Sequence, residues 1–201
     1  MLVPPELHLI TGVTGKLMNE LEYSLNRNAE GTKFLNEFHR REDIQKCVYR
    51  GSHSYQGNQA KKLLEKCDIL ERDIKQSFNF VSSTEALPFV ICLRRFKEVV
   101  TSCFGQTFDS NYKKIIQEFS DTYRSLGISV TPKVHIVETH VAEYLQLKEE
   151  KCGLGHWSEQ AMESTHHDFK VEWSKVKVSV DHAKFYETLL KTVIRYNGKH
   201  V

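Results

Sequence analysis

Apolar residues recur at spacings of three and four along most of this sequence, and this periodicity restricts the fold more than any other feature. The first such run follows Pro4 and Pro5, which suit a helix start, and consists of Leu7, Ile10, Val13, Leu17 and Leu21. Runs that alternate apolar and polar residues, as strands do, are few. The sequence therefore predicts an all-α fold, an irregular bundle of about eight helices in a single domain over residues 1–201.

Capping and breaking residues place the helices of the first half. Asn58 is a suitable N-cap for one helix over "QAKKLLEKCDILERDIK". Pro88 opens "PFVICLRRFKEVVTSCFG", an almost wholly apolar helix that we expect to be central and to end at Gly105. Before it, "FNFVSSTEAL" is interpreted as a connector in which Ser83 or Thr84 caps the helix that follows.

Similar signals continue along the second half. The helix "NYKKIIQEFSDTYRSL" is expected to stop at Gly127, and Thr131 with Pro132 forms a specific start signal for the next one. Two more helices are expected, one capped by Ser158 and one from about Asp181. Two subdivisions of the single domain are considered: a break near the 50–57 loop, within "YRGSHSYQGN" (residues 49–58), and a separate C-terminal helical pair over 152–201.

Charge, cysteine content and hydropathy exclude several classes of protein. The net charge of +2 and pI near 8.2 exclude nucleic-acid binding by overall charge alone. The five cysteines are widely spaced without a CxxC pair, so Cys67, Cys92 and Cys103 are expected to be small buried thiols in a reducing compartment. The sequence has neither an apolar run of roughly 18 residues nor a signal peptide. We therefore expect an intracellular protein, nuclear or cytoplasmic, with no membrane partner.

The segment "GLGHWSEQAMESTHHDF", Gly153–Phe169, gathers histidines and glutamates. Together with the preceding cysteine it supplies candidate ligands for zinc or another divalent metal: Cys152, His156, His166 and His167. The spacing Glu163-x-x-His166 resembles half of a carboxylate-bridged di-iron site, but it occurs only once. The alternative is a glycine turn and a capped helix that bind no cofactor, and we favour it.

Two other histidines do not suit a shared metal. His135 and His140 are five residues apart, so on an α-helix their side chains are expected to point about 140° away from each other. Familiar catalytic motifs are also missing from the sequence, including GxSxG, the P-loop, GxGxxG and HExxH. An independent hydrolase is therefore not expected.

Basic residues outnumber acidic ones from Lys170 to Val201 and alternate with aromatic residues. Phosphate neutralisation combined with base stacking would make this region a DNA contact surface. The candidate nucleic-acid-binding residues are Lys170, Lys175, Lys177 and Arg195. The alternative interpretation is an ordinary solvated helix face.

Four segments carry a resemblance to transposon-encoded or transposase-derived proteins of invertebrate genomes. They are "PPELHLITGVTGKLMNELE", "YQGNQAKKLLEK", "LGISVTPKVHIVETHVAEY" and "GLGHWSEQAMESTHHDF". In transposases with an RNase H-like core, the third metal-binding acid is a glutamate on the helix after an all-α insertion. By that analogy the resemblance implies a catalytic role for Glu163, or for Glu159 in its place. No strand-borne pair of aspartates precedes it, so this chain alone is expected to be inactive.

The sequence thus leads to two functional hypotheses. The favoured one is a non-catalytic helical interaction module derived from a transposase. Its partner would be DNA, contacted through the basic C-terminal helices, or another protein, or a second copy of the chain. The alternative is a metal-dependent enzyme or metal-stabilised domain that uses the cluster at 152–167.

Overall fold

The computed structural model describes residues 4–25, 30–49, 52–147, 152–157, 168–176, 178–179 and 181–198. The chain divides into two compact units, Met1–Ser158 and Glu159–Val201. The division falls near the predicted beginning of the C-terminal helical pair, whereas segment 50–57 belongs to the first unit.

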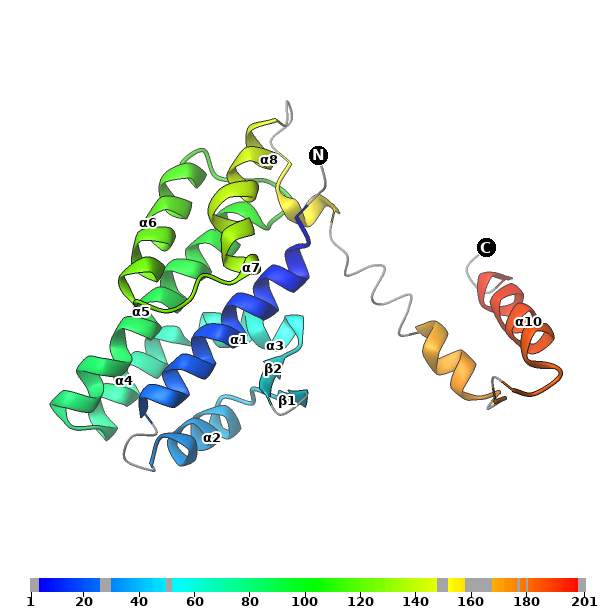
Figure 1. The fold of residues 1–201 in the computed structure, drawn as a ribbon, viewed down its shortest axis with the longest axis horizontal. Coiled ribbons are helices and arrows are strands. Elements are labelled where there is room, and N and C mark those ends of the chain that lie inside the picture. Colours follow the sequence, from blue (N-terminus) through cyan, green and yellow to red (C-terminus); the bar gives the residue numbers. More distant parts are fainter. Residues whose placement is uncertain are drawn as a thin grey trace. The chain divides into compact units, whose positions relative to one another are not determined.

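The first unit is built from helices and one two-stranded sheet (Figure 1). In chain order its elements are α1 Glu6–Leu25, α2 Gly31–Arg41, β1 Lys46–Tyr49, β2 Ser52–Tyr55, α3 Gly57–Glu65, α4 Cys67–Ser77, α5 Phe80–Cys103, α6 Tyr112–Ser125, α7 Pro132–His135, the π-helix η2 Ile136–Val141, α8 Ala142–Gln146 and the 3₁₀-helix η3 Leu154–Trp157. The predicted all-α fold is confirmed.

The central helix of the first unit is α5, which packs against α1, α3, α4 and α6. Leu93, Phe96 and Val99 from α5 are fully buried, and so are Val13 and Leu17 from α1. Burial of such side chains stabilises the fold by roughly 1.5–3 kcal/mol each. The prediction that this apolar helix is central is therefore confirmed.

The start of α5 differs from the sequence-based prediction. The helix begins at Phe80, where Oδ1 of Asn79 accepts a hydrogen bond from the Ser82 amide at 2.9 Å. Pro88, predicted to open the helix, lies in its interior, and the predicted connector is its first two turns. Proline has no amide hydrogen and normally breaks a helix. Tertiary packing of α5 on both sides of Pro88, through the fully buried Ala86 and Val90, overrides that preference.

Residues 58–75 form two helices instead of one. The chain bends at Lys66, whose amide donates to the Leu63 carbonyl at 3.0 Å, and α4 begins at Cys67. The predicted N-cap Asn58 lies inside α3, and Gln56 occupies the N-cap position instead. The apolar spacing predicts an inner face for this region, and its residues stay buried on both sides of the bend: Leu63, Leu64, Cys67, Leu70 and Ile74.

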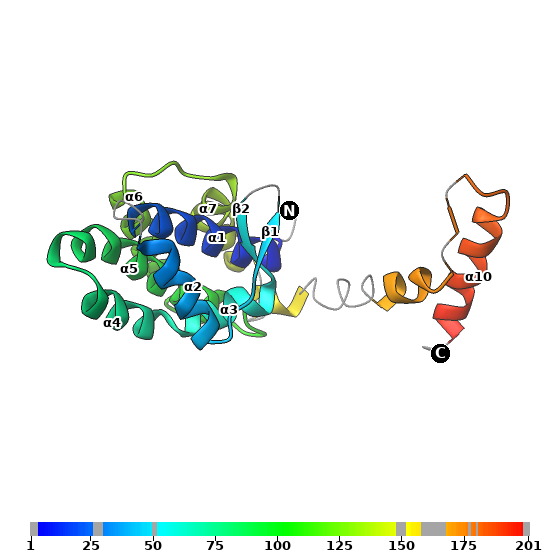
Figure 2. The same ribbon diagram turned by 90° about the horizontal axis from the view of Figure 1, so that it is seen from below.

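The predicted loop at 50–57 contains part of a β-hairpin. Strands β1 and β2 pair antiparallel, with Lys46 opposite Tyr55 and Tyr49 opposite Ser52. The hairpin packs against α1 and α3 (Figure 2). Tyr55 anchors it, because its buried hydroxyl lies 2.9 Å from Nε2 of His39 on α2. The strands are too short and too polar to show a clear alternation in the sequence.

The start signal at Thr131 is confirmed, since its hydroxyl accepts from the Val134 amide and Pro132 opens α7. The segment then continues as the π-helix η2. There each amide bonds to the carbonyl five residues earlier, so residues five apart lie one turn above each other. The ring centroids of His135 and His140 are 5.3 Å apart. The prediction that these side chains diverge is wrong.

The second unit contains α10, Phe185–Gly198, and a helical segment over 168–174. Two edge-to-face aromatic pairs join them. Phe169 contacts Tyr196 with ring centroids 5.7 Å apart, and Trp173 contacts Phe185 at 5.5 Å. The aromatic residues that the sequence interleaves with basic ones therefore form the small core of this unit.

Candidate functional site

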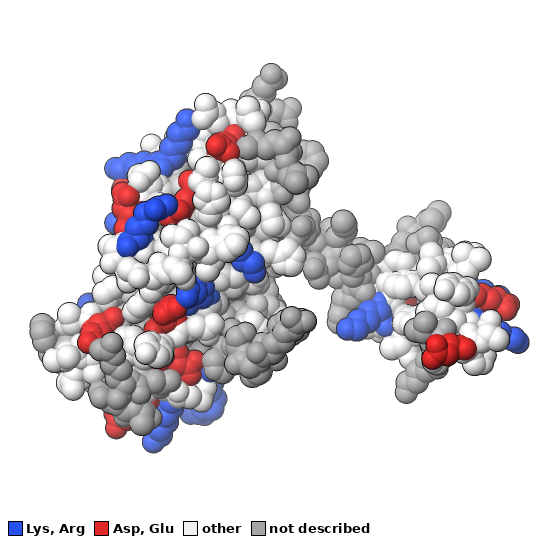
Figure 3. Space-filling model, viewed as in Figure 1, with Lys and Arg blue, Asp and Glu red and all other residues white. Residues whose placement is uncertain are grey.

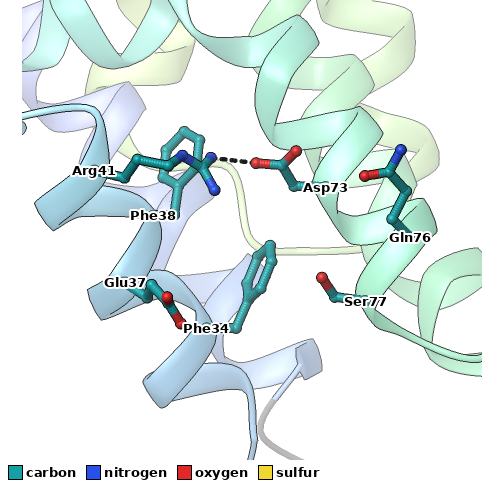
Figure 4. Close-up of a pocket in the computed structure, with 7 residues that line it drawn as sticks. All are labelled: Phe34, Glu37, Phe38, Arg41, Asp73, Gln76 and Ser77. Atoms are coloured by element: carbon teal, nitrogen blue, oxygen red, sulfur yellow. Dashed lines mark hydrogen bonds and ion pairs between the residues drawn. The ribbon is translucent and has the colours of Figure 1, made fainter.

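A pocket of about 230 Å³ lies between α2 and α4 of the first unit (Figure 4). Its lining consists of Phe34, Glu37, Phe38, Arg41, Asp73, Gln76 and Ser77. The aromatic rings of α2 form one wall, and the polar residues of α4 face them. Phe34 is held from behind by an edge-to-face contact with Phe78, with ring centroids 5.0 Å apart.

The positive charge of Arg41 in this pocket is neutralised by carboxylates. The Arg41 guanidinium lies 5.7 Å from the centre of the Phe38 ring and pairs with Asp73 across the pocket (Figure 4). It also bonds Glu42 at 3.0 Å. Hydrogen bonds to Glu42 and Asp73 raise the pKa of Arg41, and the bond from Arg41 lowers the pKa of Glu42. These interactions favour the ionised forms of Arg41 and Glu42.

The pocket lining holds no hydroxyl paired with a histidine base. Ser77 is the only hydroxyl among its lining residues, and the lining has no histidine that could act as its base. Arg41 is engaged by two carboxylates and is poorly placed to bind an anion. The arrangement joins α2 to α4 through an ion pair, and we assign it a structural role.

Of the candidate metal ligands, the structure describes only Cys152 fully. It forms an isolated antiparallel bridge with Thr107 and is of intermediate exposure. His156 belongs to η3, and its side chain is outside the described part. The candidate catalytic residue Glu163 and the ligands His166 and His167 also lie outside the described residues. Within the described part of the chain, no group of three His, Cys, Asp or Glu side chains could hold a metal ion.

The glycines of this segment have a clear structural function. Gly153 donates its amide to the Gln106 carbonyl at 2.9 Å, and Gly155 donates to that of Gly105 at 3.0 Å. A Cβ added to Gly153 would lie 2.3 Å from the Gly105 carbonyl oxygen, and one added to Gly155 would lie 2.5 Å from that of Phe104. The glycines were predicted to permit a turn. The structure shows that they permit close approach to the end of α5.

The candidate DNA-contacting residues are spread over the second unit. Lys170 lies on the helical segment 168–174, and Arg195 lies on α10. Lys175 donates to Glu172 at 2.7 Å, while Lys177 falls outside the described residues. On the face shown in Figure 3, basic and acidic side chains are interspersed on both units. The excess of basic residues in the C-terminal sequence is therefore not gathered into a concentrated basic patch on that face.

One face of α10 carries an apolar stripe, which we define as Tyr186, Leu190 and Ile194. Their exposed fractions are 79%, 61% and 63%. Residues four apart lie on the same face of a helix, so the three form one continuous strip. The opposite side of α10 is also apolar and packs within the unit through Phe185 and Tyr196. A helix that is apolar on two faces normally has both of them covered.

Comparison of the chain with protein-family models, curated proteins and solved structures finds no match. Among the described residues, no helix is both long enough and apolar enough to cross a membrane.

Sequence reasoning missed two of these features for different reasons. The stripe could have been found, because its spacing of four residues is visible in the sequence. The ion pair between Arg41 and Asp73 joins residues 32 positions apart, and no local pattern indicates it.

Proposed function

We propose that this chain is a non-catalytic interaction module of transposase origin, and that the apolar stripe of α10 binds a second copy of the chain. The exposure of Tyr186, Leu190 and Ile194 is the observation that carries this proposal. The transposase origin rests on the four resembling sequence segments alone.

The stripe has the symmetry that self-association requires. A two-fold axis brings the same surface of both copies together. Tyr186 and Ile194 each lie four residues from Leu190. An antiparallel pair of α10 helices centred on Leu190 therefore places each Leu190 against its equivalent, and each Tyr186 against Ile194 of the second copy. All three positions of the stripe would then be covered by apolar partners.

The small size of the second unit provides a reason for this pairing. Residues 159–201 form a unit near the lower limit of about 40 residues at which a domain can fold without additional support. Two aromatic pairs join its helical segments. Burial of the stripe against a second copy would add apolar contacts that the unit alone does not provide.

Sedimentation equilibrium of the full chain over a range of concentrations tests the proposal. We expect a concentration-dependent dimer that is lost in Leu190→Gln and in Ile194→Gln. The matched control is Lys191→Gln, which changes an exposed neighbour on α10 that is ion-paired to Glu187 within the helix, and it should dimerise like the wild type. A wild-type chain that stays monomeric at every concentration would contradict the proposal.

DNA binding is the competing hypothesis, and a separate titration tests it. A random-sequence duplex titrated with the full chain at two salt concentrations would show binding that weakens as salt rises if phosphates are contacted. Three results together would show that the basic residues rather than the stripe carry the function. The duplex would bind with this salt dependence, Lys170→Gln and Arg195→Gln would weaken that binding, and the chain would stay monomeric.

A further inference from the structure

We propose that His135 and His140 form a two-histidine site for a divalent transition-metal ion such as Zn²⁺. The site lies on the first unit and is independent of the stripe on α10. It also differs from the cluster at 152–167, with which it shares no residue.

The π-helix brings the two rings within reach of one ion. Metal–nitrogen bonds of 2.0–2.1 Å in a tetrahedral site place two imidazole centroids about 5 Å apart. The observed centroid separation of 5.3 Å matches that requirement. The planes of the rings are at 86°, and rotation about the broad terminal torsion of His135 can turn one of its ring nitrogens toward Nε2 of His140.

A neighbouring carboxylate orients one of the rings. Nδ1 of His140 lies 2.9 Å from Oε2 of Glu143. An ionised carboxylate only accepts hydrogen bonds, so in the neutral imidazole the proton is on Nδ1 and the lone pair of Nε2 is left for a metal. Carboxylate–histidine pairs of this kind support the ligands of many zinc sites. Glu143 therefore acts as a positioning residue.

The site is accessible and is built on a fixed segment. Both histidines are exposed, with 47% of the His140 side chain accessible. Beneath them, Glu138 accepts from Ser120 and from Arg124 of α6, each at 2.8 Å, which holds η2 in place. Imidazole suits zinc, copper and nickel. With two protein ligands, the remaining coordination positions are left to water or to a ligand from another molecule.

Calorimetric titration of the full chain with Zn²⁺ tests the site. We expect one ion to bind per chain, and His135→Ala or His140→Ala to abolish this binding, with retained circular dichroism showing that the variants are folded. Glu143→Gln should weaken the binding by about 10–100-fold, as loss of a supporting partner does elsewhere. The matched control His182→Ala, an exposed histidine of the second unit, should bind like the wild type.

A second variant separates this site from the alternative cluster. The combined changes Cys152→Ser, His156→Ala, His166→Ala and His167→Ala remove every ligand predicted there and should leave Zn²⁺ binding intact. Histidine ring ¹⁵N shifts of His135 and His140 should move when zinc is added. The proposal is overturned if the wild type binds no Zn²⁺, if the two single alanine variants bind as it does, or if the combined variant loses the binding.

Discussion

At the scale of single residues, burial decides the chemistry of the cysteines. Cys67, Cys92 and Cys103 are fully buried, and desolvation raises the pKa of each thiol from 9.0 to about 12. The thiolate is the reactive form, so these three are chemically inert at neutral pH. The sequence-based prediction of small buried thiols is confirmed. Cys47, by contrast, is exposed on β1.

The raised thiol pKa values predict alkaline destabilisation. In the unfolded chain each thiol loses its proton near pH 9, whereas in the folded chain it keeps the proton up to about pH 12. The unfolded state therefore binds fewer protons in this window, and the free energy of unfolding falls as pH rises through it. Urea denaturation at several pH values between 9 and 11 measures the slope.

A pair of variants isolates the contribution of one thiol. Cys92→Ala removes a group whose pKa is raised by burial alone, so the dependence on pH should become shallower. Cys47→Ala removes an exposed thiol and should leave the slope unchanged. Equal slopes in the two variants would show that the buried thiol does not cause the effect.

At the scale of elements, close backbone contact joins η3 to the end of α5. Gly153 and Gly155 bond to the carbonyls of Gln106 and Gly105, and the adjacent Cys152 bridges Thr107. This contact brings together residues nearly fifty positions apart in the sequence. The requirement for glycine here comes from a neighbouring segment and not from the local turn.

We expect Gly153→Ala to destabilise the chain by about 1–3 kcal/mol, the usual cost of overpacking. Gly12→Ala is the matched control. The added methyl there meets only the flexible end of the Lys133 side chain, and alanine favours the helical conformation of α1. Urea denaturation compares the two. If Gly153→Ala is as stable as Gly12→Ala, the close approach does not constrain this position.

At the scale of the whole molecule, the division at Ser158 separates a large core from a small one. Among the residues that the structure describes, the fully buried apolar ones belong to the first unit, in which α5 is surrounded by its neighbours. The second unit depends on two aromatic pairs and exposes the stripe of α10. The two units should therefore differ in their ability to fold alone.

We expect a fragment of residues 1–158 to unfold cooperatively, with a thermal midpoint within a few degrees of the main transition of the full chain. A fragment of 159–201 should gain helical content as its concentration rises, because pairing of α10 supports its fold. Circular dichroism measures both. Loss of cooperative unfolding in the first fragment, or helicity in the second that does not vary with concentration, would contradict these expectations.

Local patterns were sufficient to predict the helical class, the central position of α5, the inner faces of α1, α3 and α4, and the start of α7 at Thr131. They depend on the spacing of apolar residues and on caps, which act over a few residues of chain. Tertiary packing decided the rest, including Pro88 inside a helix, the bend at Lys66 and the hairpin anchored by Tyr55. The clearest case is the pair His135 and His140, whose spacing of five residues predicts side chains that point away from each other on an α-helix. The π-helix that unites them forms where η2 packs against α6, and no pattern within the segment itself indicates that contact.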